Sequence, residues 1–246
     1  MKLRSIHIIF ILWLLLTSNS LFAQVLMPTS ADKHDRVLLN GLWKFKYIPS
    51  DQTCADSLFY QPGFDISAWS NIKTPGNWEL QGFDEPVYGK NVKKATGLYR
   101  TDFVVPTGWK NNPVYLCFDG VSFGYSVWVN GKYVGEYASS FNRQTFDISA
   151  FVSIGKTNTL AVKVITHPKG WEFDTNDDWS LSGIIRNVTL FSLPTVHIKD
   201  LVVKTFVENK KATIALNTLI EQNFGKVLPK NLKLSARLLN ANGKLI

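Results

Sequence analysis

The 246-residue sequence predicts an all-β protein, specifically an antiparallel β-sandwich. Short runs rich in β-branched and aromatic residues recur along the chain, and Gly, Pro and Asn turn signals separate them. No segment has a helical pattern long enough to connect two parallel strands. Hydrophobic residues make up 45% of the chain, which is enough for a buried core. A disordered chain is therefore excluded.

The first segment, residues 1–23, is typical of a secretory signal peptide. Lys2 and Arg4 precede an apolar run over residues 6–16, and Ala23 closes the segment. The run is too short to cross a bilayer stably as a mature helix, and no Cys near Ala23 offers a point for lipid attachment. We therefore expect export to the periplasm or the exterior, with no membrane attachment after signal removal. A membrane anchor is the alternative.

The first predicted strand carries Trp43, Phe45 and Tyr47, which alternate with two lysines. This period of two places the aromatic rings on a face that is buried and the ammonium groups on a face that we expect to be solvated. Pro-Gly pairs punctuate residues 49–75, which we expect to be connecting structure that closes over a sheet edge. Within it, residues 64–69 predict a single helical turn.

The strongest local signal is a hairpin in the middle of the chain. Residues 125–129 and 133–137 are two strand-like runs, and Asn130-Gly131 between them suits a tight turn with positive φ. Residues 114–119 and 144–148 flank the hairpin as further short extended runs. We expect all four strands to lie in one sheet.

Three more strands are predicted on either side of this region, over residues 98–105, 158–166 and 183–193. Pro106 and Pro194 end the first and the last of them, because proline cannot donate to a sheet ladder.

Several motifs recur in a characteristic order: Phe-Asp-Gly-Val at 118–121, Val-Trp-Val-Asn-Gly-Lys-Tyr-Val-Gly at 127–135, Phe-Asp-Ile-Ser at 146–149, and Trp179 followed by Gly-Ile-Ile-Arg-Asn-Val at 183–188. In these motifs the chain resembles the amino-terminal sugar-binding domain of glycoside hydrolase family 2, which includes β-galactosidases, β-glucuronidases and β-mannosidases. The resemblance covers about 37–193 and implies a jelly-roll sandwich.

We divide the mature chain into a jelly-roll domain at 24–195 and a second unit at 196–246. Strands are predicted in the second unit over 198–207, 212–219 and 232–239, which are too few for a complete sandwich. This unit is interpreted as the truncated start of an immunoglobulin-like domain, as the resemblance also implies. The sequence is then a fragment of a longer protein.

An acidic loop at 171–179 concentrates carboxylates beside aromatic rings, including Asp174, Asp177 and Asp178. Sugar hydroxyls bond to carboxylates and sugar rings stack on aromatic faces, so this mixture favours a carbohydrate site. The residues alone also fit a solvated loop whose tryptophans pack inward. In β-galactosidases of the resembled family, an Asp two residues before the Trp contacts the substrate hydroxyls, which implies that role for Asp177.

Asn91 is the second candidate for substrate binding. The same family uses an Asn shortly after a Pro-x-Tyr element, and this chain reads Pro-Val-Tyr-Gly-Lys-Asn over 86–91. The spacing departs by one residue from the family pattern, so Lys90 is the alternative occupant of that place. A plain turn residue after Gly89 is the third interpretation of Asn91.

The net charge of +8 does not indicate a nucleic-acid partner. In 24–195 the sixteen basic and sixteen acidic side chains cancel, and the basic excess of the tail forms no cluster. The remaining histidines, His34, His167 and His197, lie far apart and lack Cys partners, so no metal-ligand spacing exists. We expect no cofactor in this portion; a divalent or monovalent cation in the missing catalytic domain stays open.

Export makes a disulfide between Cys54 and Cys117 chemically possible, although Cys117 lies in an apolar strand where a buried free thiol is ordinary. Arg186 stands among apolar residues and is expected to pair with a carboxylate. Most tryptophans are expected to pack in the core or at its rim, namely Trp43, Trp69, Trp78 and Trp128, whereas Trp171 and Trp179 fit either packing or sugar stacking.

The favoured function is therefore the non-catalytic amino-terminal portion of an exported family 2 enzyme, most simply a retaining β-galactosidase. The resemblance places both catalytic Glu residues on a (β/α)₈ barrel that the sequence does not contain, so this fragment is expected to be inactive. Its partners would be a β-galactoside or related carbohydrate and the barrel of the parent chain. The alternatives are a stand-alone carbohydrate-binding module, a purely structural domain, or a β-glucuronidase or β-mannosidase of the same family.

Overall fold

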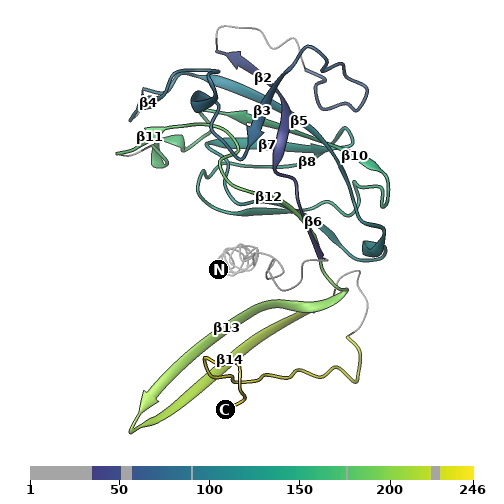
Figure 1. Ribbon diagram of the computed structural model, residues 1–246, viewed down its shortest axis with the longest axis vertical. Coiled ribbons are helices and arrows are strands. Elements are labelled where there is room, and N and C mark those ends of the chain that lie inside the picture. Colours follow the sequence, from purple (N-terminus) through teal and green to yellow (C-terminus); the bar gives the residue numbers. More distant parts are fainter. Residues whose placement is uncertain (1–34, 51–56, 90, 176, 223–227) are drawn as a thin grey trace, which may run out of the picture.

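The computed structural model describes residues 35–50, 57–89, 91–175, 177–222 and 228–246. The predicted signal peptide at 1–23 lies outside these residues. The described part is an antiparallel β-sandwich of two main sheets, with a long hairpin extending away from it (Figure 1). The prediction of an all-β sandwich is confirmed. In the described residues, no helix has the length and apolar character needed to span a membrane.

The larger sheet has six strands in the order β3-β2-β5-β10-β7-β8, and all its neighbours are antiparallel. Its strands are β2 (Gly41–Pro49), β3 (Ser70–Thr74), β5 (Ala95–Val104), β7 (Gly124–Val129), β8 (Lys132–Tyr137) and β10 (Thr157–Ile165). Central β10 pairs with β5 on one side and β7 on the other.

The second sheet has four strands in the order β1-β12-β6-β9. They are β1 (Arg36–Leu38), β6 (Val114–Phe118), β9 (Gln144–Asp147) and β12 (Val188–Ser192). The prediction that four consecutive central strands share one sheet is wrong, because β7 and β8 lie in the larger sheet while β6 and β9 pair with each other in this one. The tight turn fixes only the β7–β8 pair, so the flanking strands are free to join the opposite layer. The predicted strand at 183–193 also begins later, at Val188.

The predicted hairpin turn is confirmed by its backbone. Asn130 and Gly131 have φ values of 50° and 78°, the left-handed conformations that a tight hairpin turn requires. The Asn130 side chain also ties the turn to the sheet, because its Oδ1 accepts from the Thr159 N–H at 2.9 Å and its Nδ2 donates to the Phe151 oxygen at 2.9 Å. The sequence signal therefore specifies both the turn and its attachment.

The main core fills the space between the two sheets. Trp43 and Phe45 are buried there, as their alternation predicts, together with Trp78 and Tyr99. Gly97 of β5 is needed beside them, because a Cβ at this position would lie 2.4 Å from the Trp78 ring. Close contact between a strand backbone and an indole thus excludes any larger side chain.

The outer face of the six-stranded sheet is covered, contrary to the expectation that it is solvated. Phe59 and Trp69 are 4% and 8% exposed and pack with Leu98 and Ala161 in a second buried cluster. Residues 57–69 therefore cover a sheet face rather than an edge, and they contain turns instead of the predicted helical turn. Burial of these aromatic side chains against the sheet stabilises the connection in this position.

After the sandwich, β13 (Val196–Glu208) and β14 (Lys211–Gln222) form a two-stranded antiparallel ribbon (Figure 1). The strand predicted at 232–239 is wrong: this segment contains no strand and makes one isolated bridge, between Leu239 and Leu245. Its apolar residues pair with no neighbouring strand in the described structure, and a strand requires such a partner. The domain boundary at 195 and the immunoglobulin-like character of the tail stay predictions.

Candidate functional site

A small ribbon at the edge of the sandwich brings together the two segments that the sequence singles out. β4 (Val87–Tyr88) pairs with β11 (Trp179–Ser180), so that Tyr88 lies opposite Trp179. The Gly89 N–H donates to the Asp178 backbone oxygen at 2.9 Å and continues the pairing by one residue. The candidate loops at 86–91 and 171–179 are therefore neighbours, although about 90 residues of chain separate them.

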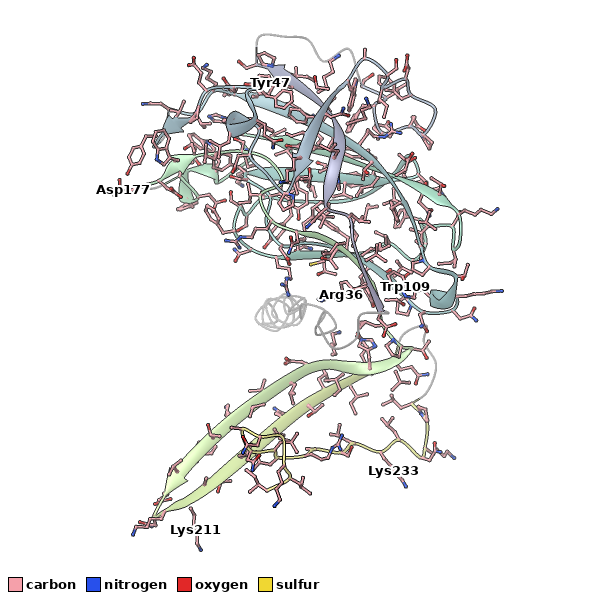
Figure 2. All side chains as sticks on the ribbon, in the orientation of Figure 1. Arg36, Tyr47, Trp109, Asp177, Lys211 and Lys233 are labelled. Atoms are coloured by element: carbon pink, nitrogen blue, oxygen red, sulfur yellow. The ribbon has the colours of Figure 1, made fainter. Side chains whose placement is uncertain are left out.

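Asp177 lies at the outer margin of this ribbon and is exposed (Figure 2). Its Oδ1 accepts a hydrogen bond from the Tyr88 hydroxyl at 2.5 Å, and this bond is the main cause that raises the pKa of Tyr88. Tyr88 and Trp179 are each about half exposed, and their rings meet edge to face with centroids 5.6 Å apart. An exposed carboxylate bonded to one member of a pair of accessible aromatic rings is the mixture that carbohydrates bind.

Asn91 is exposed and lies between β4 and β5, two residues beyond Gly89. Lys90, the alternative occupant of the same place in the family pattern, lies outside the described residues. Asn91 is therefore close to the ribbon along the chain. The assignments of Asn91 and Asp177 to substrate binding stay predictions.

Two other acidic residues of the loop, Asp174 and Asp178, bond to backbone N–H groups. Asp174 is half-buried, and its Oδ2 accepts from both the N–H and the hydroxyl of Ser140 at 2.8 Å. Asp178 accepts from the Trp179 N–H at 2.7 Å. Asp177 differs from both, because its described contact is with a tyrosine hydroxyl at the surface rather than with the backbone.

Two residues that the sequence reasoning did not single out complete the site. Tyr88 is the partner of Asp177, and Glu79 anchors the chain that follows β11. Glu79 begins a short 3-10 helix, η2 (Glu79–Gln81), and its Oε2 accepts from the Ser182 N–H at 2.9 Å. It is 6% exposed, and burial raises its pKa to about 6. An acidic residue directly after Trp78 gives little indication in the sequence that it belongs to the site, because its partner lies 103 residues away.

Three further side chains that the sequence singles out near this region differ in their exposure. Trp171, in η4 (Trp171–Phe173), is partly buried, with ring centroids 4.2 Å from His167 and 6.4 Å from Phe123. Trp179, in contrast, is accessible. Arg186 is exposed rather than semi-buried; it donates to the Phe141 oxygen at 2.8 Å and lies over the Phe141 ring, so the expected carboxylate is not among its described contacts.

The described residues contain neither a cluster of metal-binding side chains nor an accessible thiol. Within it, no group of three or more His, Cys, Asp or Glu side chains could hold a metal ion. Cys117 is a buried free thiol, and burial raises its pKa to about 11, which keeps it protonated. Cys54, the other candidate for a disulfide, lies outside the described residues.

Residues 37–194 match the family described as "Glycosyl hydrolases family 2, sugar binding domain". The chain belongs to this family. Among curated relatives, it is 38% identical over 181 residues to a β-galactosidase from Psychromonas ingrahamii, which covers 68% of this chain and 17% of that protein. A β-galactosidase from Halalkalibacterium halodurans is 31% identical over 225 residues, covering 85% of this chain and 22% of that protein.

Solved β-glucuronidase structures share this fold. A Bacteroides uniformis β-glucuronidase superposes with a TM-score of 0.65 and 27% identity, covering 77% of this chain and 22% of that one. A Ruminococcus gnavus β-glucuronidase superposes with a TM-score of 0.68 at 19% identity, over 91% of this chain and 38% of that one, which supports the fold alone. The chain spans about a fifth of the length of the curated β-galactosidases that it matches.

Proposed function

We propose that this chain is the amino-terminal, non-catalytic portion of an exported, retaining β-galactosidase of glycosyl hydrolase family 2. The observation that carries the proposal is the exposed Asp177 carboxylate, which is bonded to Tyr88, whose ring in turn meets the accessible Trp179 ring. The similar β-galactosidases support the activity of the parent protein.

The role of this portion is to position the terminal sugar. The Asp177 carboxylate would accept hydrogen bonds from sugar hydroxyls, while the acid and the nucleophile come from the barrel of the parent chain. Holding a substrate in the reacting geometry accelerates a reaction without supplying a reacting group. The isolated portion is accordingly expected to hydrolyse nothing.

The charges of the ribbon favour a neutral sugar over a uronic acid. Asp177 and Asp178 are adjacent in the chain, and both are exposed. The carboxylate of a glucuronide would meet like charge here, which disfavours binding. A β-galactoside is therefore the proposed substrate, and a β-glucuronide is the alternative that the similar solved structures suggest.

The experiment is Asp177→Ala in the full-length parent enzyme, assayed on p-nitrophenyl β-galactoside and p-nitrophenyl β-glucuronide. Loss of a hydrogen bond to a charged group should lower kcat/KM on the galactoside by roughly 10- to 100-fold. The control is Glu136→Ala, which removes another exposed carboxylate that accepts from a tyrosine, Tyr133, within β8 of the larger sheet. An unchanged kcat/KM for Asp177→Ala removes Asp177 from the site.

A stand-alone carbohydrate-binding module would behave differently. In that case the chain itself should bind galactose or lactose measurably in isothermal titration, whereas a half-site completed by a barrel should bind very weakly. Export is tested separately: sequencing the amino terminus of the mature protein should find Gln24 first, because the signal motif ends at Ala23.

A further inference from the structure

Glu79 is a buried carboxylate that bonds to the chain just after the acidic loop at 171–179. Its side chain is 6% exposed, with its Oε2 accepting from the Ser182 N–H at 2.9 Å. The preceding residue, Trp78, donates its own N–H to the Ser182 oxygen at 3.1 Å. Two consecutive residues therefore bind both backbone groups of Ser182, which is itself fully buried.

Neighbouring hydrogen bonds extend this attachment. The Gly76 N–H donates to the Ile184 oxygen at 2.8 Å, and Gly183 exchanges two backbone bonds with Ser122. Residues 182–184 are thus fixed from two sides, by residues 76–79 and by Ser122. We name residues 76–79 with 182–184 the Glu79 clamp.

Only Leu181 separates the clamp from β11, whose residues pair with β4 and so with Tyr88. The acidic loop is therefore fastened at both ends: Asp174 binds Ser140 at its start, and Glu79 binds Ser182 after its end. Asp177 lies between these two anchors. A shift of the chain at Ser182 would move β11 and change the place where the Asp177 carboxylate meets Tyr88.

We propose that Glu79 is a positioning residue that fixes the Asp177 carboxylate in the sugar site through Ser182 and the β4–β11 ribbon. The inference rests on the proposed function of Asp177 and adds a buried residue that does not touch the sugar. The carboxylate is suited to this task because it is the acceptor for an N–H that would otherwise be buried without a partner.

The surroundings of Glu79 are consistent with a fixed acceptor. Glu79 interacts electrostatically with three nearby side chains, Tyr47, Asp84 and Tyr99. Asp84 in turn accepts from the Tyr47 hydroxyl and pairs with Lys93 at 3.2 Å. This second network holds the chain that leads into β4, so both strands of the ribbon are anchored in the sandwich.

A double-mutant cycle in the full-length parent enzyme tests the inference. Glu79→Met keeps the length of the side chain and removes the acceptor, whereas Glu79→Gln keeps an acceptor oxygen. We expect Glu79→Met to lower kcat/KM on p-nitrophenyl β-galactoside by about 10-fold and Glu79→Gln by less than about 3-fold. In the Asp177→Ala background, Glu79→Met should cost less than about 2-fold, because the carboxylate that it positions is already gone.

Glu79→Asp is the second variant, for use if Glu79→Met does not fold. It keeps the charge but shortens the side chain by one methylene group, so it should show the same loss and the same dependence on Asp177. An equal loss with and without Asp177 would mean a general structural role and would overturn this inference alone. If Asp177→Ala by itself has no effect, the proposed function is overturned, and this inference with it.

Discussion

The sandwich and the β13–β14 hairpin differ in what covers their apolar side chains. In the sandwich, Trp78 and Phe45 are fully buried between two sheets, and residues 57–69 cover the outer face of the larger sheet as well. In the hairpin, Phe206 is 57% exposed and Val207 79% exposed. Two strands alone cannot enclose a core, because a ribbon has no second layer.

The same comparison indicates how the position of the candidate site is fixed. The β4–β11 ribbon has only two residues in each strand, yet the half-buried Asp174 and the buried Glu79 tie it to the sandwich. Within the part of the chain that the structure describes, most of the long hairpin has no such anchor. An exposed functional side chain is held in place by buried neighbours rather than by the length of its own strand.

The two regions should differ most in how much one substitution lowers the free energy of unfolding. Trp78→Ala should lower the free energy of unfolding by about 3–5 kcal/mol, because it removes a buried indole from contact with Gly97 and Phe45. Phe206→Ala in the hairpin should change it by less than about 0.5 kcal/mol. Urea unfolding of the purified chain measures both. Equal costs would mean that the hairpin has a core of its own.

A smaller effect depends on pH and on the buried anchor. The folded pKa of Glu79, about 6, lies above its ordinary value of 4.5, so the folded state holds this proton more tightly than the unfolded state. The contribution of Glu79 to the free energy of unfolding should therefore fall by about 2 kcal/mol as pH rises from 4.5 through 6. Glu79→Gln should lack this change.

Urea titrations of wild type and Glu79→Gln at pH 4.5 and pH 7 measure that contribution. The variant should gain stability relative to wild type as the pH rises. A constant difference between the two proteins would show that Glu79 is solvated.

The smallest effect on folding concerns the hairpin surface. We expect the isolated chain to self-associate, because β13 and β14 expose apolar side chains and open strand edges. Phe206→Lys should reduce association while changing the free energy of unfolding by less than about 0.5 kcal/mol. Light scattering at high protein concentration is the measurement. A wild-type chain that stays a monodisperse monomer would contradict this expectation.

Local patterns predicted those parts of the fold that local chemistry determines. Asn130-Gly131 specifies its own turn, and Trp43 and Phe45 alternate because their strand has one buried core face. Sheet membership was not predictable in this way, since β6 pairs with β9 and β12 across long stretches of chain. The segment at 232–239 failed for the same reason: a strand-like pattern forms no strand without a partner.

The candidate site was predicted in part. The family motifs drew attention to Asp177 and to the 86–91 segment, and the β4–β11 pairing brings both to one edge. Tyr88 and Glu79 were missed as site residues, because their partners lie 89 and 103 residues away and neither pairing has a local signature. Such contacts follow from the whole topology rather than from any short window of sequence.

In the proposed function, Asp177 faces a sugar in a pocket that the parent enzyme completes. The most direct test is a crystal structure of the full-length enzyme with a bound, non-hydrolysable β-galactoside. We expect an Asp177 carboxylate oxygen within about 3.2 Å of a sugar hydroxyl, with Tyr88 still bonded to the same carboxylate. A sugar bound in the barrel with Asp177 more than about 6 Å away, with no water bridging them, would contradict the account.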